Sequence, residues 1–275
     1  MAVSFHKMHG LGNDFVLLDL RHQDFPINSK SSAELADRHT GIGCDQVLVL
    51  RYPENDQQLA SFEIWNSDGS PAEQCGNGVR CLGLYLHMRA ETPGGEFLLA
   101  GPTGTVKIEC LDENRVKVDM GRPDFHADHI SVSLPAEGDW YLLEIDQKPY
   151  RLGTVSMGNP HAVMVVDDVD SVDVAHLGAI ISRHSAFPEG CNAGFAEIVE
   201  RENIRLRVYE RGAAETRACG SGACAAVSVL RRAGLVAETV KVTQTGGDLI
   251  LTWMGGEKPV KMMGPATHVF KGTFT

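Results

Sequence analysis

Short strand-like segments, rather than long helical ones, dominate the hydrophobic pattern of this 275-residue chain. Apolar and β-branched residues gather in short runs bounded by turn residues, as they do in strands. Such runs predict strands over residues 15–20, 116–120, 162–166 and 249–253. Helical signals are too few to alternate with every strand, so the pattern favours an α+β fold over a doubly wound α/β fold.

The helical signals fall in four places. Residues 31–34 read Ser-Ser-Ala-Glu, the pattern of a capping box, and predict a helix that runs towards His39. Apolar residues at helical spacing predict another helix over 173–184. Two more helices are expected over 77–89 and 221–233, each directly after a Cys-Gly-x-Gly turn.

Landmarks of the first half of the chain recur in the second half in the same order. The offsets between matching landmarks lie between 144 and 147 residues. The pairs are Asn13 with Asn159, Arg38-His39 with Arg183-His184, Gly43-Cys44-Asp45 with Gly190-Cys191-Asn192, and Cys75-Gly76-Asn77-Gly78 with Cys219-Gly220-Ser221-Gly222. This self-similarity predicts a duplicated domain. We expect one half over 1–121, carrying Cys75, and the other over 122–263, carrying Cys219.

Composition and charge exclude several classes of protein. The formal net charge of −11, with no block of consecutive Lys and Arg, disfavours binding to nucleic-acid phosphates. No signal-peptide pattern and no apolar run of membrane-spanning length is present, so we expect a soluble cytoplasmic protein. The seven cysteines are an odd number and include no Cys-x-x-Cys, which predicts free thiols rather than structural disulfides or a metal site.

Two of these cysteines stand where a thiol is chemically useful. Cys75 and Cys219 each come directly before a predicted helix, where free N–H groups and the helix dipole stabilise a thiolate. The same N–H groups bind anions, and the glycines of each turn let a carboxylate reach the backbone. A thiol base beside a carboxylate site suits proton removal from the α-carbon of an amino acid.

Two such units, related by duplication, suit stereoinversion. One thiolate removes the α-proton from one face of the carbon, and the other thiol delivers a proton to the opposite face. One sulfur is then ionised while the other is protonated, and the pair titrates as a unit. The other five cysteines are interpreted as small buried apolar residues: Cys44, Cys81, Cys110, Cys191 and Cys224.

Matched polar residues lie close to the two thiols in the sequence. Asn13 and Asn159 occupy equivalent turns, and Asn66 and Glu210 precede the two cysteine loops. Asparagine in a Gly-rich turn often serves the turn alone. Their repetition at matched positions favours a role in the site.

Arg211 and His161, both in the second half, each allow two interpretations. Arg211 is a candidate partner for a substrate carboxylate, or else forms a surface ion pair with Glu210 or Glu215. His161 either tunes a nearby thiol or is a core histidine.

Several blocks of the chain resemble the diaminopimelate epimerase family, whose members interconvert LL- and meso-2,6-diaminopimelate without pyridoxal phosphate. The matching blocks are Lys-Met-His-Gly-Leu-Gly-Asn-Asp-Phe at 7–15, Asn-Ser-Asp-Gly-Ser at 66–70, Gln-Cys-Gly-Asn-Gly-Val-Arg at 74–80, Met-Gly-Asn-Pro-His at 157–161 and Glu-Arg-Gly to Ala-Cys-Gly-Ser-Gly over 210–222. The resemblance implies a cytoplasmic isomerase of lysine and peptidoglycan-precursor biosynthesis, with no cofactor or metal. It also implies two similar α+β domains, each a mixed sheet or barrel around a central helix, a tail over 264–275 that returns to the first domain, and a homodimer.

The resemblance also implies roles for individual residues. Cys75 and Cys219 match the catalytic pair, and His161 and Glu210 match residues that adjust the thiols. The positions that match substrate contacts are Asn13, Gln46, Asn66, Gly76, Asn77, Asn159, Asn192, Glu210, Arg211, Gly220 and Ser221.

The chain departs from the family pattern at two positions. Ala214 stands where a Gly usually precedes Glu-Thr, so a positive φ there would cost free energy. Phe270 stands where a Tyr contributes to dimer contacts, and it lacks the hydroxyl.

Four other functions fit part of the pattern. A proline or hydroxyproline racemase would use the same two thiols on a smaller substrate, whereas Glu210, Arg211 and the asparagines favour a substrate with a second polar end. An isomerase of this fold without paired cysteines is disfavoured by both thiols. A thiol redox sensor or a non-catalytic amino-acid-binding protein would also use reactive thiols at helix ends.

Overall fold

The computed structural model describes residues 2–134 and 136–275 and divides into two compact units. Unit 1 comprises Met1–Asp119 with Met263–Thr275, and unit 2 comprises Met120–Met262. Strands outnumber helices in both units, so the predicted α+β class is confirmed. No helix in the described part of the chain is long and apolar enough to span a membrane.

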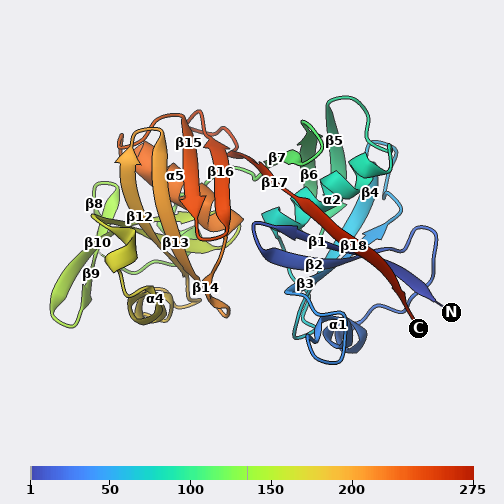
Figure 1. Ribbon diagram of the computed structural model, residues 1–275. Helices are drawn as coiled ribbons and strands as arrows, with labels where there is room; N and C mark the ends of the chain where they lie inside the picture. Colours follow the sequence, from blue (N-terminus) through green and yellow to red (C-terminus); the bar gives the residue numbers. More distant parts are fainter. Residues whose placement is uncertain (1, 135) are drawn as a thin grey trace. The chain divides into compact units, whose positions relative to one another are not determined.

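Unit 1 is built from strands that surround one helix, α2 (Gly76–Met88), while a second helix, α1 (Ser29–Ala36), lies outside them (Figure 1). Its strands are β1 (Val3–Gly10), β2 (Asn13–Asp19), β3 (Gln46–Arg51), β4 (Ala60–Asn66), β5 (Glu96–Gly101), β6 (Gly104–Cys110), β7 (Arg115–Asp119) and β18 (Thr267–Phe274).

Unit 2 repeats this construction with additional short elements. Its helices are α3 (Ala127–Ile130), the 3-10 turn η1 (Val169–Ser171), α4 (Val174–Ser182) and α5 (Gly220–Arg232). Its strands are β8 (Ala136–Glu137), β9 (Trp140–Ile145), β10 (Lys148–Ser156), β11 (Pro160–Val166), β12 (Asn192–Glu200), β13 (Asn203–Glu210), β14 (Ala214–Thr216), β15 (Thr239–Gln244) and β16 (Gly247–Thr252). Strand β17 (Lys261–Pro265) crosses the division between the units.

The order of strand pairings is the same in both units. In unit 1, β1–β2 is antiparallel, β2–β3 parallel, β3–β4 antiparallel, β4–β5 parallel and β5–β6 antiparallel. In unit 2, the series β10, β11, β12, β13, β15 and β16 pairs in that same alternation. Because parallel and antiparallel pairs recur in one order, the predicted duplication extends from sequence motifs to the topology of each sheet.

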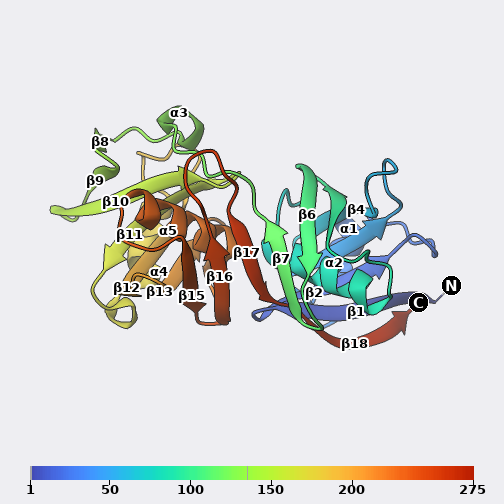
Figure 2. The ribbon, with the colours of Figure 1, turned by 90° about the horizontal axis from the view of Figure 1, so that it is seen from above.

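Each unit wraps its strands around one buried helix. Helix α2 contacts β1, β2, β3, β6, β7 and β18, and 11 of its 13 residues are buried. Helix α5 contacts β10, β11, β12, β13 and β16 in the same way (Figures 1 and 2). Packing is so close that a Cβ atom at Gly153 of β10 would lie 2.3 Å from Val229 Cγ1 of α5. A helix buried on nearly all sides needs mostly apolar or small residues all round, and both sequences provide them, apart from the buried Asn77 and Arg80 of α2.

The predicted helices and strands are present, with shifts of one to two residues at most of their ends. The predicted capping box at residues 31–34 is wrong, because α1 begins earlier. Asn28 is the N-cap, its side chain accepts hydrogen bonds from the N–H groups of Lys30 and Ser31, and the Ser31 hydroxyl completes the box. Asparagine caps a helix as well as serine does, and it stands first along the chain.

The C-terminal segment belongs to unit 1. Strand β18 runs antiparallel to β1, with Val3 opposite Phe274 and Met8 opposite His268. Figure 2 shows the two strands side by side. The N-terminal unit is therefore completed by the end of the chain.

Candidate functional site

The first candidate thiol caps a buried helix. Cys75 is the N-cap of α2, and its Sγ accepts the backbone N–H of Gly78 at 3.4 Å. The sulfur is partly exposed, whereas the residues that follow it are buried. A Cβ atom at Gly78 would lie 2.9 Å from Leu48 Cδ2, so a larger residue here would require the Leu48 side chain to shift. The first turn of the helix directs its free N–H groups past the sulfur, where an anion would be stabilised.

Side-chain amides surround Cys75. Its Sγ lies 3.6 Å from Asn13 Oδ1, which also accepts the Asn77 Nδ2–H at 3.2 Å. Asn13 Nδ2 donates to Asp45 at 3.0 Å. Two of the predicted substrate contacts, Asn13 and Asn77, are thus directly connected to the thiol loop.

Gln46 and Asn66 form a separate polar pair in unit 1. They lie opposite one another on β3 and β4, and Gln46 Nε2 donates to Asn66 Oδ1 at 2.9 Å. Asn66 Nδ2 donates to Ser70 Oγ at 3.0 Å. Their amide groups are held in place at the ends of two strands.

The second candidate thiol has the same backbone setting and a different polar partner. Cys219 is the N-cap of α5, and its Sγ accepts the Gly222 N–H at 3.3 Å. The Sγ–H donates to Glu210 Oε2 at 3.0 Å, and Ser221 Oγ lies 3.5 Å away. A Cβ atom at Gly222 would lie 3.2 Å from this sulfur. The match between the two loops therefore extends to atomic detail around each sulfur.

The environment of Cys219 reverses the expected effect on its acidity. Burial and then the charge of Glu210 raise the pKa of the Cys219 thiol well above its ordinary value. The Gly222 N–H and Ser221 lower it, but by less. The prediction of a thiolate stabilised by the helix terminus is therefore wrong for Cys219 in this state. Burial and the Glu210 carboxylate at the end of β13 outweigh the effect of the helix terminus on this pKa.

His161 is buried and uncharged. Burial, followed by the positive charge of Arg211, lowers the pKa of His161 to about 3. Its Nε2 lies 2.9 Å from Asn159 Oδ1, which assigns the proton to Nε2. Asn159 and His161 are thus in contact, and His161 contributes no positive charge near neutral pH.

Arg211 is held by neutral oxygen atoms. Its backbone N–H donates to Asn192 Oδ1 at 2.9 Å, and its Nη1 donates to the Glu189 carbonyl at 2.6 Å. Glu215 pairs instead with Arg207, at 2.7 Å, so the suggested ion pair of Arg211 with Glu215 is wrong. The exposed guanidinium of Arg211 retains donors for an anion.

The other five cysteines behave as apolar residues. Four are buried, Cys110 is partly exposed, and none of the seven cysteines forms a disulfide in the described structure. Burial raises the pKa of Cys44 and of Cys110 to about 11, and that of Cys191 to about 12. Such thiols are poor nucleophiles and bases near neutral pH.

Ala214, which departs from the family pattern, has a left-handed backbone with a φ of 61°. Its position opposite Glu210 on β14 lies in the hairpin that carries the carboxylate next to Cys219. An alanine in this conformation costs about 1 to 2 kcal/mol, because its Cβ approaches the following carbonyl oxygen.

Ala214→Gly is expected to raise the free energy of unfolding by about 0.5 to 1 kcal/mol. The strain is removed, and the greater freedom of glycine in the unfolded chain offsets part of the gain. Urea denaturation measures the change. Ala213→Gly, next to it and outside the left-handed region, is the matched control and is expected to destabilise. Equal effects of both substitutions would contradict the assignment of strain to Ala214.

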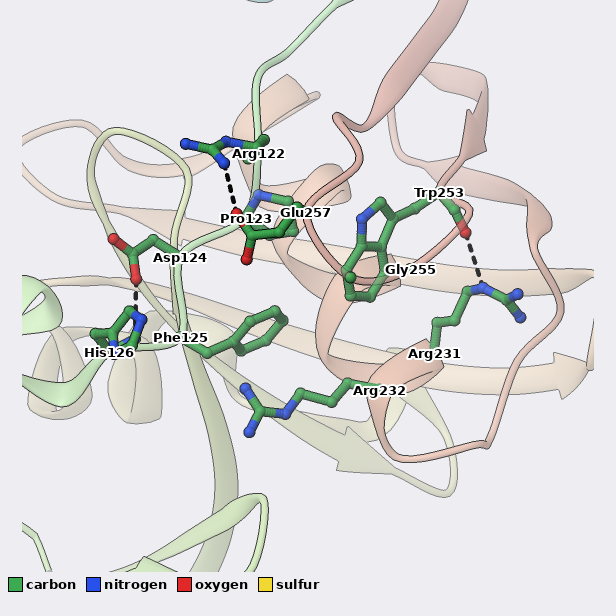
Figure 3. A pocket seen from close by; sticks show the side chains of 11 residues that line it. Arg122, Pro123, Asp124, Phe125, His126, Arg231, Arg232, Trp253, Gly255 and Glu257 are labelled. Atoms are coloured by element: carbon green, nitrogen blue, oxygen red, sulfur yellow. Dashed lines mark hydrogen bonds and ion pairs between the residues drawn. The ribbon is translucent and has the colours of Figure 1, made fainter.

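A broad hollow in unit 2 lies apart from the predicted site residues. It has a volume of about 990 Å³ and includes Arg122, Phe125, Arg232, Trp253 and Glu257 in its lining. In Figure 3 the Arg232 guanidinium lies beside the Phe125 ring, 4.4 Å from its centroid, and Arg122 pairs with Glu257. Arg122 and Glu257 pair with each other and Arg232 lies over the Phe125 ring, so we interpret this hollow as structural. Among the described residues no group of three or more His, Cys, Asp or Glu side chains is arranged to hold a metal ion.

Comparison with known proteins decides the family. The family model "Diaminopimelate epimerase" matches residues 5–126 and 153–269. A diaminopimelate epimerase of Xanthomonas axonopodis pv. citri is 46% identical over 269 residues, which are 98% of this chain and 95% of the relative. One of Teredinibacter turnerae is 46% identical over 272 residues, 99% of both chains. This chain belongs to the diaminopimelate epimerase family.

Solved structures of other proteins are similar in fold to this member of the epimerase family. A probable proline racemase from Agrobacterium radiobacter has a TM-score of 0.71 at 16% identity, covering 99% of this chain and 93% of that one. A PhzF-family phenazine biosynthesis protein of Bacillus anthracis has a TM-score of 0.69 at 13% identity, covering 100% and 99%. The two-unit fold is thus shared with proteins of other names.

Arg80 and Gln244 are polar residues that contact the two thiol loops. The sequence analysis did not predict them as site residues. Arg80 is fully buried and bonds to Asn77, and Gln244 Oε1 accepts the Cys219 backbone N–H at 2.9 Å. A charged residue within an otherwise apolar helix was the available signal for Arg80. Gln244 gave no local signal, because its contact spans 25 residues of sequence.

Proposed function

We propose that this protein is a diaminopimelate epimerase that interconverts the LL and meso isomers by proton transfer between two thiols and the α-carbon, with no cofactor. The observation that carries the mechanism is the matched placement of Cys75 and Cys219. Each is the N-cap of the central helix of its unit, and each accepts the N–H three residues later. The activity belongs to lysine biosynthesis.

The proposed step conserves protons and charge. One thiolate takes the α-hydrogen as a proton, and the electron pair of the C–H bond passes into the α-carboxylate. The opposite thiol then gives its proton to the other face of the carbon, and the electron pair returns to form the new C–H bond. The sulfur that was ionised ends protonated, and the sulfur that was protonated ends ionised.

The helix termini stabilise the charge that develops on the carboxylate. We assign this role to the N-terminal backbone of Gly76 and Asn77 in α2 and of Gly220 and Ser221 in α5. Preorganised N–H donors aimed at a developing oxyanion are a large part of many enzymatic rate enhancements. Because a cysteine is the N-cap of each helix, the proposed base and the proposed oxyanion site lie in the same turn.

Glu210 is proposed to exchange a proton with Cys219. The 3.0 Å Sγ–Oε2 contact places a carboxylate where it can receive the thiol proton and return it. His161 is proposed to tune the thiols as a buried neutral imidazole and not as a cation, since burial lowers its pKa to about 3.

The remaining polar residues are proposed to hold the distal amino-acid end of the substrate. Amides can accept from an ammonium and donate to a carboxylate, while Arg211 offers a fork of donors to a carboxylate. The proposed contacts are Asn13, Gln46, Asn66, Asn159, Asn192, Glu210 and Arg211.

Hydrogen exchange tests the proposed function directly. Purified reduced protein is mixed with LL-diaminopimelate in D2O, without added cofactor, and followed by NMR. Deuterium is expected at one α-carbon together with the meso isomer. Exchange and inversion of proline or hydroxyproline, with none of diaminopimelate, would support a smaller-substrate racemase instead. No exchange with any of these substrates would favour a thiol sensor or a binding protein.

We also propose that the protein is a homodimer. Strand β18 exposes Val269 and Phe270, which are 53% and 47% accessible, and the Phe270 ring packs edge-on against Phe5. Exposed apolar side chains on one strand are typical of an association surface. Sedimentation velocity measures the mass in solution and so tests for the dimer. A cytoplasmic location of the protein stays a prediction.

A further inference from the structure

Asp45 joins the starts of two strands of unit 1 and lies outside the set of predicted site residues. It directly precedes Gln46, where β3 begins, and it contacts the start of β2, which begins at Asn13. The backbone N–H of Asp14 donates to Asp45 Oδ2 at 3.1 Å, and the backbone N–H of Asp45 donates to Asp14 Oδ1 at 3.0 Å. The two carboxylates therefore hold the starts of β2 and β3 together in a reciprocal way.

Two cations neutralise these carboxylates. Arg38 Nη2 donates to Asp45 Oδ1 at 2.7 Å and to Asp14 Oδ1 at 2.6 Å, and Lys7 pairs with Asp14 at 2.5 Å. Burial alone would raise the pKa of Asp14, but the hydrogen bonds and charges of Arg38 and Lys7 outweigh it and lower that pKa to about 2. Because Arg38 binds Oδ1 of Asp45, the other oxygen of this carboxylate faces Asn13.

The carboxylate of Asp45 fixes which way the amide of Asn13 faces. Asn13 Nδ2 donates to Asp45 Oδ2 at 3.0 Å. A carboxylate paired with a guanidinium only accepts hydrogen bonds, so Asn13 turns its NH2 group towards Asp45 and its oxygen the other way. That oxygen accepts from Asn77 Nδ2 at 3.2 Å and from Cys75 Sγ at 3.6 Å. Asp45 thus determines that Asn13 presents an oxygen, and not an N–H, to the first thiol loop.

The second unit orients its matching asparagine by another group. Asn159 matches Asn13, and its Oδ1 lies 2.9 Å from His161 Nε2. At the position that matches Asp45, unit 2 has the amide Asn192. A neutral imidazole therefore orients Asn159, whereas a carboxylate orients Asn13. The orienting carboxylate is a feature of unit 1 and not of the construction that the two units share.

We propose that Asp45 is a positioning residue of the first thiol loop: through Asn13 it holds an amide oxygen against the Cys75 thiol and against Asn77 in the first turn of α2. Asp45 itself bonds to Asn13, Asp14 and Arg38, and it acts on the thiol only through Asn13. This inference rests on the proposed two-thiol function and adds to it a residue that reaches the loop through a neighbour.

Two variants of similar size separate the acceptor from the charge. Asp45→Asn and Asp45→Leu both remove the negative charge and the ion pair with Arg38. Only Asp45→Asn keeps an oxygen that accepts from Asn13 Nδ2 and from the Asp14 N–H. Asp45→Asn is expected to keep kcat/KM for diaminopimelate within about twofold of the wild-type value. Asp45→Leu is expected to lower kcat/KM at least about tenfold, because the orientation of Asn13 is no longer fixed.

Thiol alkylation gives a second readout that does not use the epimerase reaction. The full-length reduced protein is treated with iodoacetamide over a series of pH values, and each cysteine is quantified by peptide mass spectrometry. In Asp45→Leu, Asn13 is free to turn its Nδ2 towards the Cys75 sulfur, and a donor there favours the thiolate. The pH of half-maximal alkylation of Cys75 is expected to lie about half a unit lower in Asp45→Leu than in Asp45→Asn, with Cys219 unchanged in both.

Asp112→Asn is the matched control. It removes the ion pair with Arg115 between β6 and β7 and should change neither kcat/KM nor the Cys75 profile. Circular dichroism checks the fold of each variant. Where Asp45→Leu does not fold, Asp45→Ser is measured in its place, because its hydroxyl is one bond shorter than the carboxylate and leaves Asn13 unheld.

The outcomes are distinguishable from those of the proposed function. Equal effects of folded Asp45→Asn and Asp45→Leu would show that only the charge of Asp45 matters, and they overturn its role as the acceptor for Asn13. A Cys75 profile that is the same in both variants overturns it as well. If the wild type does not invert diaminopimelate but the two profiles separate as expected, the role of Asp45 holds and the substrate assignment fails.

Discussion

Replacing either Cys75 or Cys219 with serine is expected to slow inversion of diaminopimelate by about three orders of magnitude. A serine hydroxyl fits the same N-cap position and still accepts the N–H of Gly78 or Gly222. It is, however, a far weaker acid than a thiol, so it neither ionises near neutral pH nor transfers its proton readily. Fold and substrate binding are therefore expected to survive while the chemical step fails.

The measurement is the initial rate of meso isomer formation from the LL isomer. A variant that retains one thiol can remove a proton and return one to the same face, so solvent exchange is expected to fall less than inversion. Cys110→Ser is the matched control, since its sulfur bonds the Gly83 carbonyl at 3.3 Å outside the thiol loops, and it should retain wild-type inversion. Wild-type inversion in Cys75→Ser or Cys219→Ser would refute the two-thiol mechanism.

Glu210→Gln is expected to lower kcat for inversion by about a hundredfold. The amide has the shape of the carboxylate but does not take up the proton of Cys219. It also removes the negative charge that adds to burial in raising the pKa of Cys219. The substitution is therefore expected to slow turnover and to lower the pH at which alkylation of Cys219 by iodoacetamide, quantified by peptide mass spectrometry, is half-maximal.

Kinetics in both directions provide an internal check. An enzyme does not change the equilibrium between two isomers, so kcat/KM must fall by the same factor from LL to meso and from meso to LL. Glu215→Gln, on the same hairpin and paired with Arg207, is the control that should leave kcat unchanged. A Glu210→Gln enzyme with unchanged kcat and an unchanged Cys219 profile would contradict the proposed exchange of a proton.

These experiments address different parts of the site. The serine substitutions test whether both sulfur atoms transfer protons, and Glu210→Gln tests whether Glu210 accepts the proton of the second thiol. Alkylation is quantified separately for Cys75 and Cys219. In Glu210→Gln, Cys75 therefore serves as the reference thiol. In the proposed mechanism one sulfur is ionised while the other is protonated, so the pair is expected to titrate as one coupled system.

Local pattern determined much of this protein. The two Cys-Gly-x-Gly turns located both N-caps. A helix begins where its first free N–H groups find a side-chain acceptor, and a few adjacent residues decide this. Strand runs and repeated landmarks predicted an α+β duplication, and the repeated order of parallel and antiparallel pairs agrees with it. The capping box of α1 failed for a local reason, since two acceptable caps competed and Asn28 stands first.

Only the tertiary structure decided the electrostatics. From sequence, Cys75 and Cys219 are equivalent thiols at helix ends. Folding buries Cys219 with its thiol donating to Glu210, whereas Cys75 stays partly exposed with its thiol donating to the neutral Asn13 Oδ1. A pKa depends on the solvent and charges within a few ångströms of the group, and those neighbours come from strands and helices distant in sequence.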